Sequence, residues 1–356
     1  MHAFSAADLI SPAIKRTKWF LFEPFRWSTF LKLCAVAVLT EGGASGNFNF
    51  PGGSHSSTAG SATGHSIPSI TAPHFGLSPM AIALIAAIIV VSIGLILVVA
   101  YLITRLRFAL FNCLVTGTRE IRPGWRRYDV QSWRFFLLSL AVGIVMFFAL
   151  LLVSIPFILG FYRMYQSSQA GVTPNFAALF ALILPLIPII IIFVLLGIAI
   201  HLILHDLMLP HIALENASAT EAWEQARRRI AAEKGGFALY ALLRILLPIA
   251  ATIGAMIVLA IPALIGALVL AAPAIWLGTL TASATGLSKL LFILFISLIV
   301  LVGVALIVFV SLCIGGPIGI AARNYALLFY GGRYQVLGDL LSPPPPPLVS
   351  NPSAAV

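Results

Sequence analysis

The sequence predicts an all-α integral membrane protein: a helical bundle of about six transmembrane helices with two or three in-plane amphipathic helices. Of the 356 residues, 60% are apolar and only 9% are charged, against roughly 45–50% and about 25% in soluble domains. Several apolar runs reach the roughly 20 residues that cross a bilayer core about 30 Å thick. The mean hydropathy of +1.06 means more apolar surface than a soluble fold of this length can bury.

Residues 1–27 are predicted to form an amphipathic helix in the membrane interface, because Ser11 and Pro12 are typical of a helix start. The apolar run 28–40 follows. It is short for a span, but its Lys32 lies near the start and can reach the headgroups. We interpret it as the first span, and a cleaved signal peptide is the alternative.

Residues 41–78 are rich in Gly, Ser, Asn and Pro and contain no Lys or Arg, which favours a flexible loop outside the cytoplasm. A single transmembrane domain is expected over 28–335. Pro185 and Pro188 should kink one of its helices. After the run 28–40, the further spans are expected at about 79–104, 135–159, 176–203, 237–270 and 288–313.

Shorter helices are predicted between and after the spans. Ser218 and Glu221 have capping-box spacing and open an in-plane helix that ends at Gly235 and Gly236. Three prolines leave two readings of residues 237–286, one long kinked helix or a two-helix hairpin.

Near the C-terminus, a transmembrane helix is expected to end at a glycine-proline segment and to be followed by an interface helix. The last span should stop at Gly315-Gly316-Pro317, and 318–330 should continue as an interface helix. Residues 342–356 contain five consecutive prolines and are predicted to be a disordered tail.

The basic residues indicate the orientation. In the six-span topology, all of the 21 Lys and Arg except Arg163 and Lys289 fall on one side of the membrane. The positive-inside rule makes that side the cytoplasm. We therefore expect a multi-pass membrane protein with both termini cytoplasmic.

The strongest candidate for a chemical site is HLILHDLMLPH, residues 201–211. His201 and His205 are four apart on a helix, and Asp206 and His211 follow, a plausible ligand set for zinc or iron. The alternative is interfacial histidines with a carboxylate that pairs with nearby arginines. No cofactor is expected, and we find no catalytic constellation.

A second set of candidates consists of arginines that would bind lipid headgroups, because seven arginines lie within 105–134. The partners expected are the bilayer, its anionic phospholipids and a membrane protein. Nucleic acid is not expected, since the basic residues border apolar runs. The four headgroup candidates are Arg119, Arg122, Arg126 and Arg127.

Three passages carry a family resemblance: RLRFALFNCLVTGTREIRPGWRRY (105–128), DLMLP (206–210) and GGPIGIAARNYALLFYGG (315–332). They resemble uncharacterised bacterial polytopic membrane proteins, distantly like the membrane domain fused to some glycerophosphodiester phosphodiesterases. The resemblance implies about six spans in a bacterial inner membrane. It implies no catalytic residues, because the ligands of the phosphodiesterase domain have no counterpart here.

The function expected first is therefore that of a non-enzymatic scaffold or accessory protein that engages anionic lipids and protein partners. A permease for a small or lipidic solute is the second hypothesis, because prolines break the apolar helices. A membrane metalloenzyme using the histidine and aspartate cluster is the third.

Overall fold

A computed structural model describes residues 5–41, 79–169, 176–282 and 286–341. Within these ranges the chain is helical and contains no strand, as the composition predicts. The predicted outer loop 41–78, apart from Glu41, and the proline tail 342–356 lie outside the described residues.

Twelve α-helices and one π-helical turn make up the described chain. They are α1 (Ile10–Phe22), α2 (Trp27–Glu41), α3 (Pro79–Thr116), α4 (Ile121–Arg127), α5 (Asp129–Gln169), α6 (Phe176–Ile183), α7 (Leu186–Leu202), the π-helix η1 (Ile203–Met208), α8 (Leu209–Leu214), α9 (Ala219–Ala232), α10 (Lys234–Ala282), α11 (Leu287–Gly331) and α12 (Gln335–Leu341).

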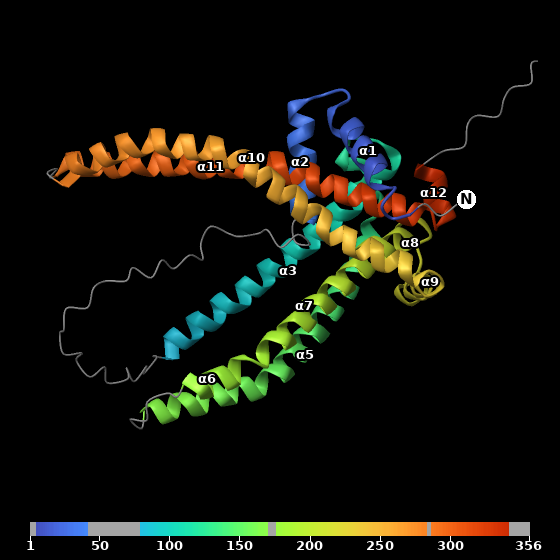
Figure 1. Cartoon of the computed structure of the whole chain (residues 1–356), viewed down its shortest axis with the longest axis horizontal. Helices are drawn as coiled ribbons and strands as arrows, with labels where there is room; N and C mark the ends of the chain where they lie inside the picture. The colour runs from blue at the N-terminus through green and yellow to red at the C-terminus, as the bar shows by residue number, and fades with distance from the viewer. Residues whose placement is uncertain (1–4, 42–78, 170–175, 283–285, 342–356) are drawn as a thin grey trace, which may run out of the picture.

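The helices form a compact hub from which apolar arms extend. Figure 1 shows α1, α2, α4, α8, α9 and α12 gathered where one end of α3, α5, α7, α10 and α11 meets them. Three arms leave this hub. The first is α3, the second consists of α5 together with α6 and α7, and the third consists of α10 together with α11. The arms expose large apolar side chains such as Val91, at 70%, so their solvent is lipid.

In the part of the chain that the structure describes, five helical stretches are long and apolar enough to cross a membrane, which makes this a multi-pass membrane protein. They are Pro79–Thr116, Asp129–Ser167, Leu179–Leu214, Lys234–Ile261 and Leu294–Gly331. The expected sixth, 28–40, corresponds to α2, which has 15 residues and is shorter than the roughly 20 that a crossing needs.

The core of the hub is built from the ends of the spans. Phe108, Phe111 and Leu114 of α3 are almost fully buried, whereas the arm of the same helix is exposed. Helix α1 packs on α11, where Asn324 Nδ2 donates to Thr17 Oγ1 at 2.9 Å. The buried side of α1 contains Ala13, Thr17 and Leu21, whereas Ile14 is exposed.

The two proline signals had different outcomes. The kink expected from Pro185 and Pro188 is confirmed at Pro185, because α6 ends before it and α7 begins after it, whereas Pro188 lies within α7. The break expected at Gly315-Gly316-Pro317 is wrong, because α11 runs through Pro317. Packing of α2 on this part of α11, where Gly316 meets Cys34, holds the helix together against the local stop signal.

The remaining helix boundaries can also be compared with their predictions. The capping box of Ser218 and Glu221 is confirmed at the start of α9. The end predicted at Gly235 and Gly236 is wrong, because α9 stops at Ala232 and both glycines belong to the first turn of α10. Of the two readings of 237–286, the described part is one helix, α10.

Candidate functional site

The π-helical turn η1 joins the end of α7 to the hub. A π-turn accommodates one extra residue in an α-helix, and such turns are frequent at functional sites. Here His205 and Asp206 are both buried, although they are adjacent in sequence. Each therefore points to a different set of partners within the hub.

Asp206 is the acceptor at the centre of a buried network. Its Oδ2 accepts from Tyr240 Oη at 2.7 Å and from Arg244 Nε at 3.1 Å. Its Oδ1 accepts from Arg323 Nη1 at 2.7 Å, and the same nitrogen donates to the His205 carbonyl at 2.8 Å. A buried carboxylate with three donors is paired well enough to stay charged.

Glu41 extends this network from the last turn of α2. Its Oε2 accepts from Arg244 Nη2 at 2.7 Å, and its Oε1 lies 3.9 Å from Arg323 Nε. Sequence reasoning had put Glu41 in the outer loop, and that boundary is wrong because Glu41 is helical and buried. The two carboxylates and two guanidinium groups form one cluster.

Arg107 of α3 completes the network through neutral partners. Its Nε donates to the Thr40 carbonyl at 3.0 Å, and its Nη1 lies 2.8 Å from His205 Nε2. A guanidinium group only donates hydrogen bonds, so His205 accepts with an unprotonated nitrogen. The network thus joins α2, α3, η1, α10 and α11, and its three guanidinium groups exceed its two carboxylates by one charge.

The structure separates the four residues proposed as metal ligands. The rings of His201 and His205 lie 4.2 Å apart between centroids, as their spacing predicts, but both oxygens of Asp206 already accept from arginine or tyrosine. His211 is in another cluster, where its Nε2 lies 2.6 Å from Tyr330 Oη.

The geometry consequently offers no support for the metal site. Over the described ranges, no group of three or more His, Cys, Asp and Glu side chains is placed to hold a metal ion. The arrangement matches the alternative reading, in which a carboxylate pairs with arginines.

The four arginines proposed to bind headgroups have two different environments. Arg119 donates to the backbone carbonyls of Trp19, Glu23 and Pro24, so it fastens the corner between α1 and α2. The other three, Arg122, Arg126 and Arg127, are exposed on α4.

Helix α4 is held against α3 with its arginines outward. Gly124 is buried against Ala109 and Asn112 of α3. Arg122 and Arg126 are two residues before and after Gly124, which puts them on the opposite side of a helix with 3.6 residues per turn. Among the described residues, neither forms an ion pair.

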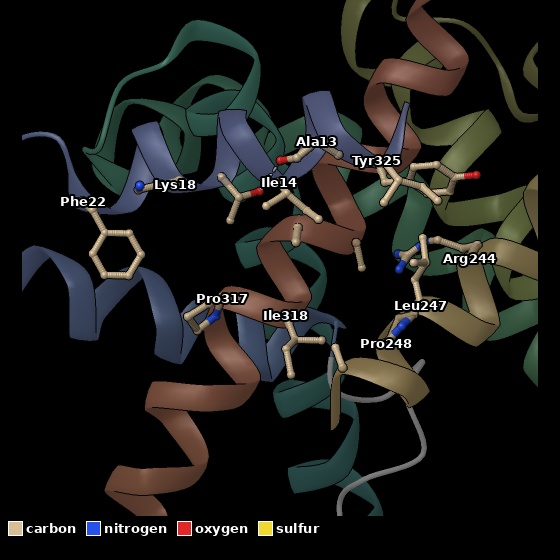
Figure 2. A pocket seen from close by; sticks show the side chains of 15 residues that line it. Ala13, Ile14, Lys18, Phe22, Arg244, Leu247, Pro248, Pro317, Ile318 and Tyr325 are labelled. Carbon is tan, nitrogen blue, oxygen red and sulfur yellow. Dashed lines mark hydrogen bonds between the residues drawn. The ribbon is translucent and has the colours of Figure 1, made fainter. Parts of the chain in front are cut away.

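An apolar groove lies on another face of the hub. It has a volume of about 420 Å³ and runs between α1, α10 and α11. Figure 2 shows Phe22 and Lys18 at one end, Arg244 and Leu247 at the other, and Pro317 with Ile318 between them. No local sequence pattern indicates this groove, because its walls come from three segments that are distant in the chain.

Sequence reasoning missed the central network as well. From the sequence, Arg244 and Arg323 only indicate the orientation in the membrane, and no partner is predicted for either. The available signal was a set of single charges within or beside apolar runs, since such charges are costly unless they are paired. Glu41 and Asp206 are the complementary acids at the ends of two other runs.

Comparison with known proteins shows a match to a family model. The model matches residues 4–340, nearly the whole chain, and is described as a family of unknown function, DUF7544. No curated protein and no solved structure matches.

Proposed function

The chain belongs to a family of unknown function, DUF7544, and from the geometry of its hub we propose that it is a non-enzymatic membrane protein that binds anionic phospholipids. The observation that carries the proposal is the trio Arg122, Arg126 and Arg127 on α4. These side chains are exposed, and Gly124 of the same helix packs against Ala109 and Asn112 of α3. Each basic residue near an anionic membrane surface contributes about 1 kcal/mol of attraction.

Exposed aromatic side chains at the corner of α1 and α2 support the same location. Phe22, Phe25 and Trp27 are between 43% and 60% exposed and contact one another. Arg26 lies within this cluster and is exposed too. Aromatic and basic side chains together are typical of the membrane interface.

The distribution of charge supports a cytoplasmic hub, and we place the protein in a cell inner membrane as part of the same proposal. Arg163 near the end of α5 and Lys289 near the start of α11 belong to the far ends of the arms, while the other Lys and Arg belong to the hub or its margin. The positive-inside rule then favours a cytoplasmic hub. Because α1 and α12 both pack in the hub, with Arg16 Nη1 donating to the Leu341 carbonyl at 3.2 Å, both ends of the described chain share that side.

The test is the amount of anionic phospholipid that the purified protein retains. A variant with Arg122, Arg126 and Arg127 all changed to Gln should retain several-fold less phosphatidylglycerol than the wild type. A matched variant with the same three residues changed to Lys keeps the charge and should retain the wild-type amount. Equal retention by the Gln and Lys variants would contradict the proposal. Arg119 is left unchanged, because its loss would disturb α1.

A further inference from the structure

The groove between α1, α10 and α11 has the lining and the volume expected of a site that binds one hydrocarbon chain. Its walls are apolar side chains, among them Ile14, Leu247, Pro248 and Ile318. Its volume of about 420 Å³ falls within the roughly 300–1,000 Å³ of small-molecule sites. Its lining on α10 and α11 comes from residues 244–251 and 317–325. These segments lie where the α10 and α11 arm of Figure 1 joins the hub, so an acyl chain from the bilayer can enter the groove.

Two cations line the groove, and they differ in what they can bind. Arg244 is buried and already donates to Asp206 and Glu41, so it has little capacity for another anion. Lys18 is exposed at the opposite end, beside Phe22 (Figure 2). Within the described residues, the Lys18 ammonium forms no hydrogen bond or ion pair. It is therefore the cation that can meet a ligand.

The two ends of the groove match the two parts of an anionic phospholipid. Phe22 belongs to the exposed aromatic cluster at the corner of α1 and α2, where an interfacial headgroup belongs, and Lys18 lies at the same end of the groove. The apolar walls continue away from Lys18 toward Leu247 and Pro248 (Figure 2). A phosphate at Lys18 would place an acyl chain along those walls.

We propose that this groove binds one anionic phospholipid, with Lys18 contacting the phosphate and the space between α1, α10 and α11 holding an acyl chain. The inference deepens the proposed function and rests on it, since it assigns one bound lipid to a defined site. The α4 arginines attract anionic headgroups over a surface. The groove would retain a single molecule.

The experiment uses phosphatidylglycerol with a photoreactive group on one acyl chain and the full-length protein in nanodiscs. Loose lipid is removed with detergent, the sample is irradiated, and labelled peptides are identified by mass spectrometry. Phosphatidylcholine with the same labelled chain is the comparison. We expect phosphatidylglycerol to label peptides that contain Ile14, Leu247 or Ile318 at least several-fold more strongly than phosphatidylcholine does.

A matched pair of lysine variants tests the headgroup contact. Lys15 and Lys18 are both exposed on α1, but only Lys18 lines the groove. Lys18→Gln should lower phosphatidylglycerol labelling about fivefold, which corresponds to about 1 kcal/mol for one basic residue, and Lys15→Gln should leave it unchanged. Equal losses in the two variants would overturn the role of Lys18.

Filling the groove tests the acyl-chain site. Ala321→Phe places a ring in the groove, and Ala251→Phe does so from the exposed wall on α10. Both should abolish labelling of the groove peptides, while Ala238→Phe on exposed α10 surface outside the groove should not. Labelling spread evenly along the arms of the wild type would overturn the proposal.

The failure of this inference can be told apart from that of the proposed function. If only the proposal for the groove is wrong, the variant with Gln at the three α4 arginines still retains less lipid than the wild type, while groove peptides are unlabelled in the wild type. If only the proposal for the α4 surface is wrong, that variant retains the same amount of lipid as the wild type, and the groove peptides stay labelled.

Discussion

Arg323 Nη1 lies 2.7 Å from Asp206 Oδ1, and both side chains are buried. This ion pair connects α11 to the π-helical turn η1 across 117 residues of sequence. Asp206 also accepts from Arg244 of α10, so one carboxylate joins the π-helical turn after α7 to both α10 and α11.

Asp206→Asn should therefore destabilise the protein strongly. Removing one charge of a buried network leaves Arg244 and Arg323 without their main counterion, which costs about 3–5 kcal/mol. Asp129→Asn is the control, because Asp129 pairs with Arg105 at 2.8 Å but its side chain is 61% exposed, so its loss should cost about 0–1 kcal/mol. Thermal unfolding in detergent, followed by circular dichroism, measures both. Similar midpoints for the two variants would contradict the central role of Asp206.

Gly316→Ala should separate α2 from α11. A Cβ atom at Gly316 would lie 2.6 Å from Cys34 Cα, closer than real contacts allow, and overpacking of this kind costs about 1–3 kcal/mol. Cys34 is fully buried in the wild type, so displacement of α2 should make it react with a maleimide. Gly303→Ala on the same helix meets nothing within 4 Å and should leave Cys34 protected, as read from labelled peptides.

The helical architecture was predictable because its signals are local. Long apolar runs define the five spans, and the capping box of Ser218 and Glu221 marks the start of α9. Glu224 and Arg228 of α9 form an ion pair at 2.8 Å, since residues four apart are neighbours on any α-helix.

The buried network was not predictable in the same way. Glu41 and Arg244 are 203 residues apart, and no local pattern indicates that α2 ends beside α10. The continuation of α11 through Pro317 also depends on a distant element, because α2 packs on that segment. Local propensity yields to tertiary packing at such positions.

Arg119→Gln should loosen the corner between α1 and α2 without unfolding the arms. The guanidinium group donates to three backbone carbonyls there, including Pro24 O at 2.7 Å. Losing charged hydrogen bonds of about 1 kcal/mol in total should speed hydrogen exchange at this corner about fivefold. Arg122→Gln is the matched control on α4 and should exchange like the wild type. Unchanged exchange in the Arg119 variant would show that these contacts do not hold the corner.

Glu233 and Arg333 form an ion pair between the start of α10 and the end of α11. Arg333 Nε and Nη2 each donate to a Glu233 carboxylate oxygen at 2.7 Å. These hydrogen bonds from Arg333 lower the pKa of Glu233 below its ordinary value. Gly236 leaves room for this arrangement, because a Cβ atom there would lie 2.5 Å from Glu233 Oε1, whereas a Cβ atom at Gly235 would meet nothing within 4 Å.

Gly236→Ala should remove the acid-sensitive part of stability that this pair supplies. A carboxyl group with a lowered folded-state pKa stabilises the protein above its unfolded-state pKa and loses that effect as the pH falls through the folded-state value. The contribution is at most about 1 kcal/mol, since 43% of the Glu233 side chain is exposed. Unfolding midpoints measured from pH 7 to pH 3 should therefore fall less steeply in Gly236→Ala than in Gly235→Ala. Glu233→Gln should give the same shallow curve as Gly236→Ala, and a steep curve in either would show that the ion pair does not contribute to folding.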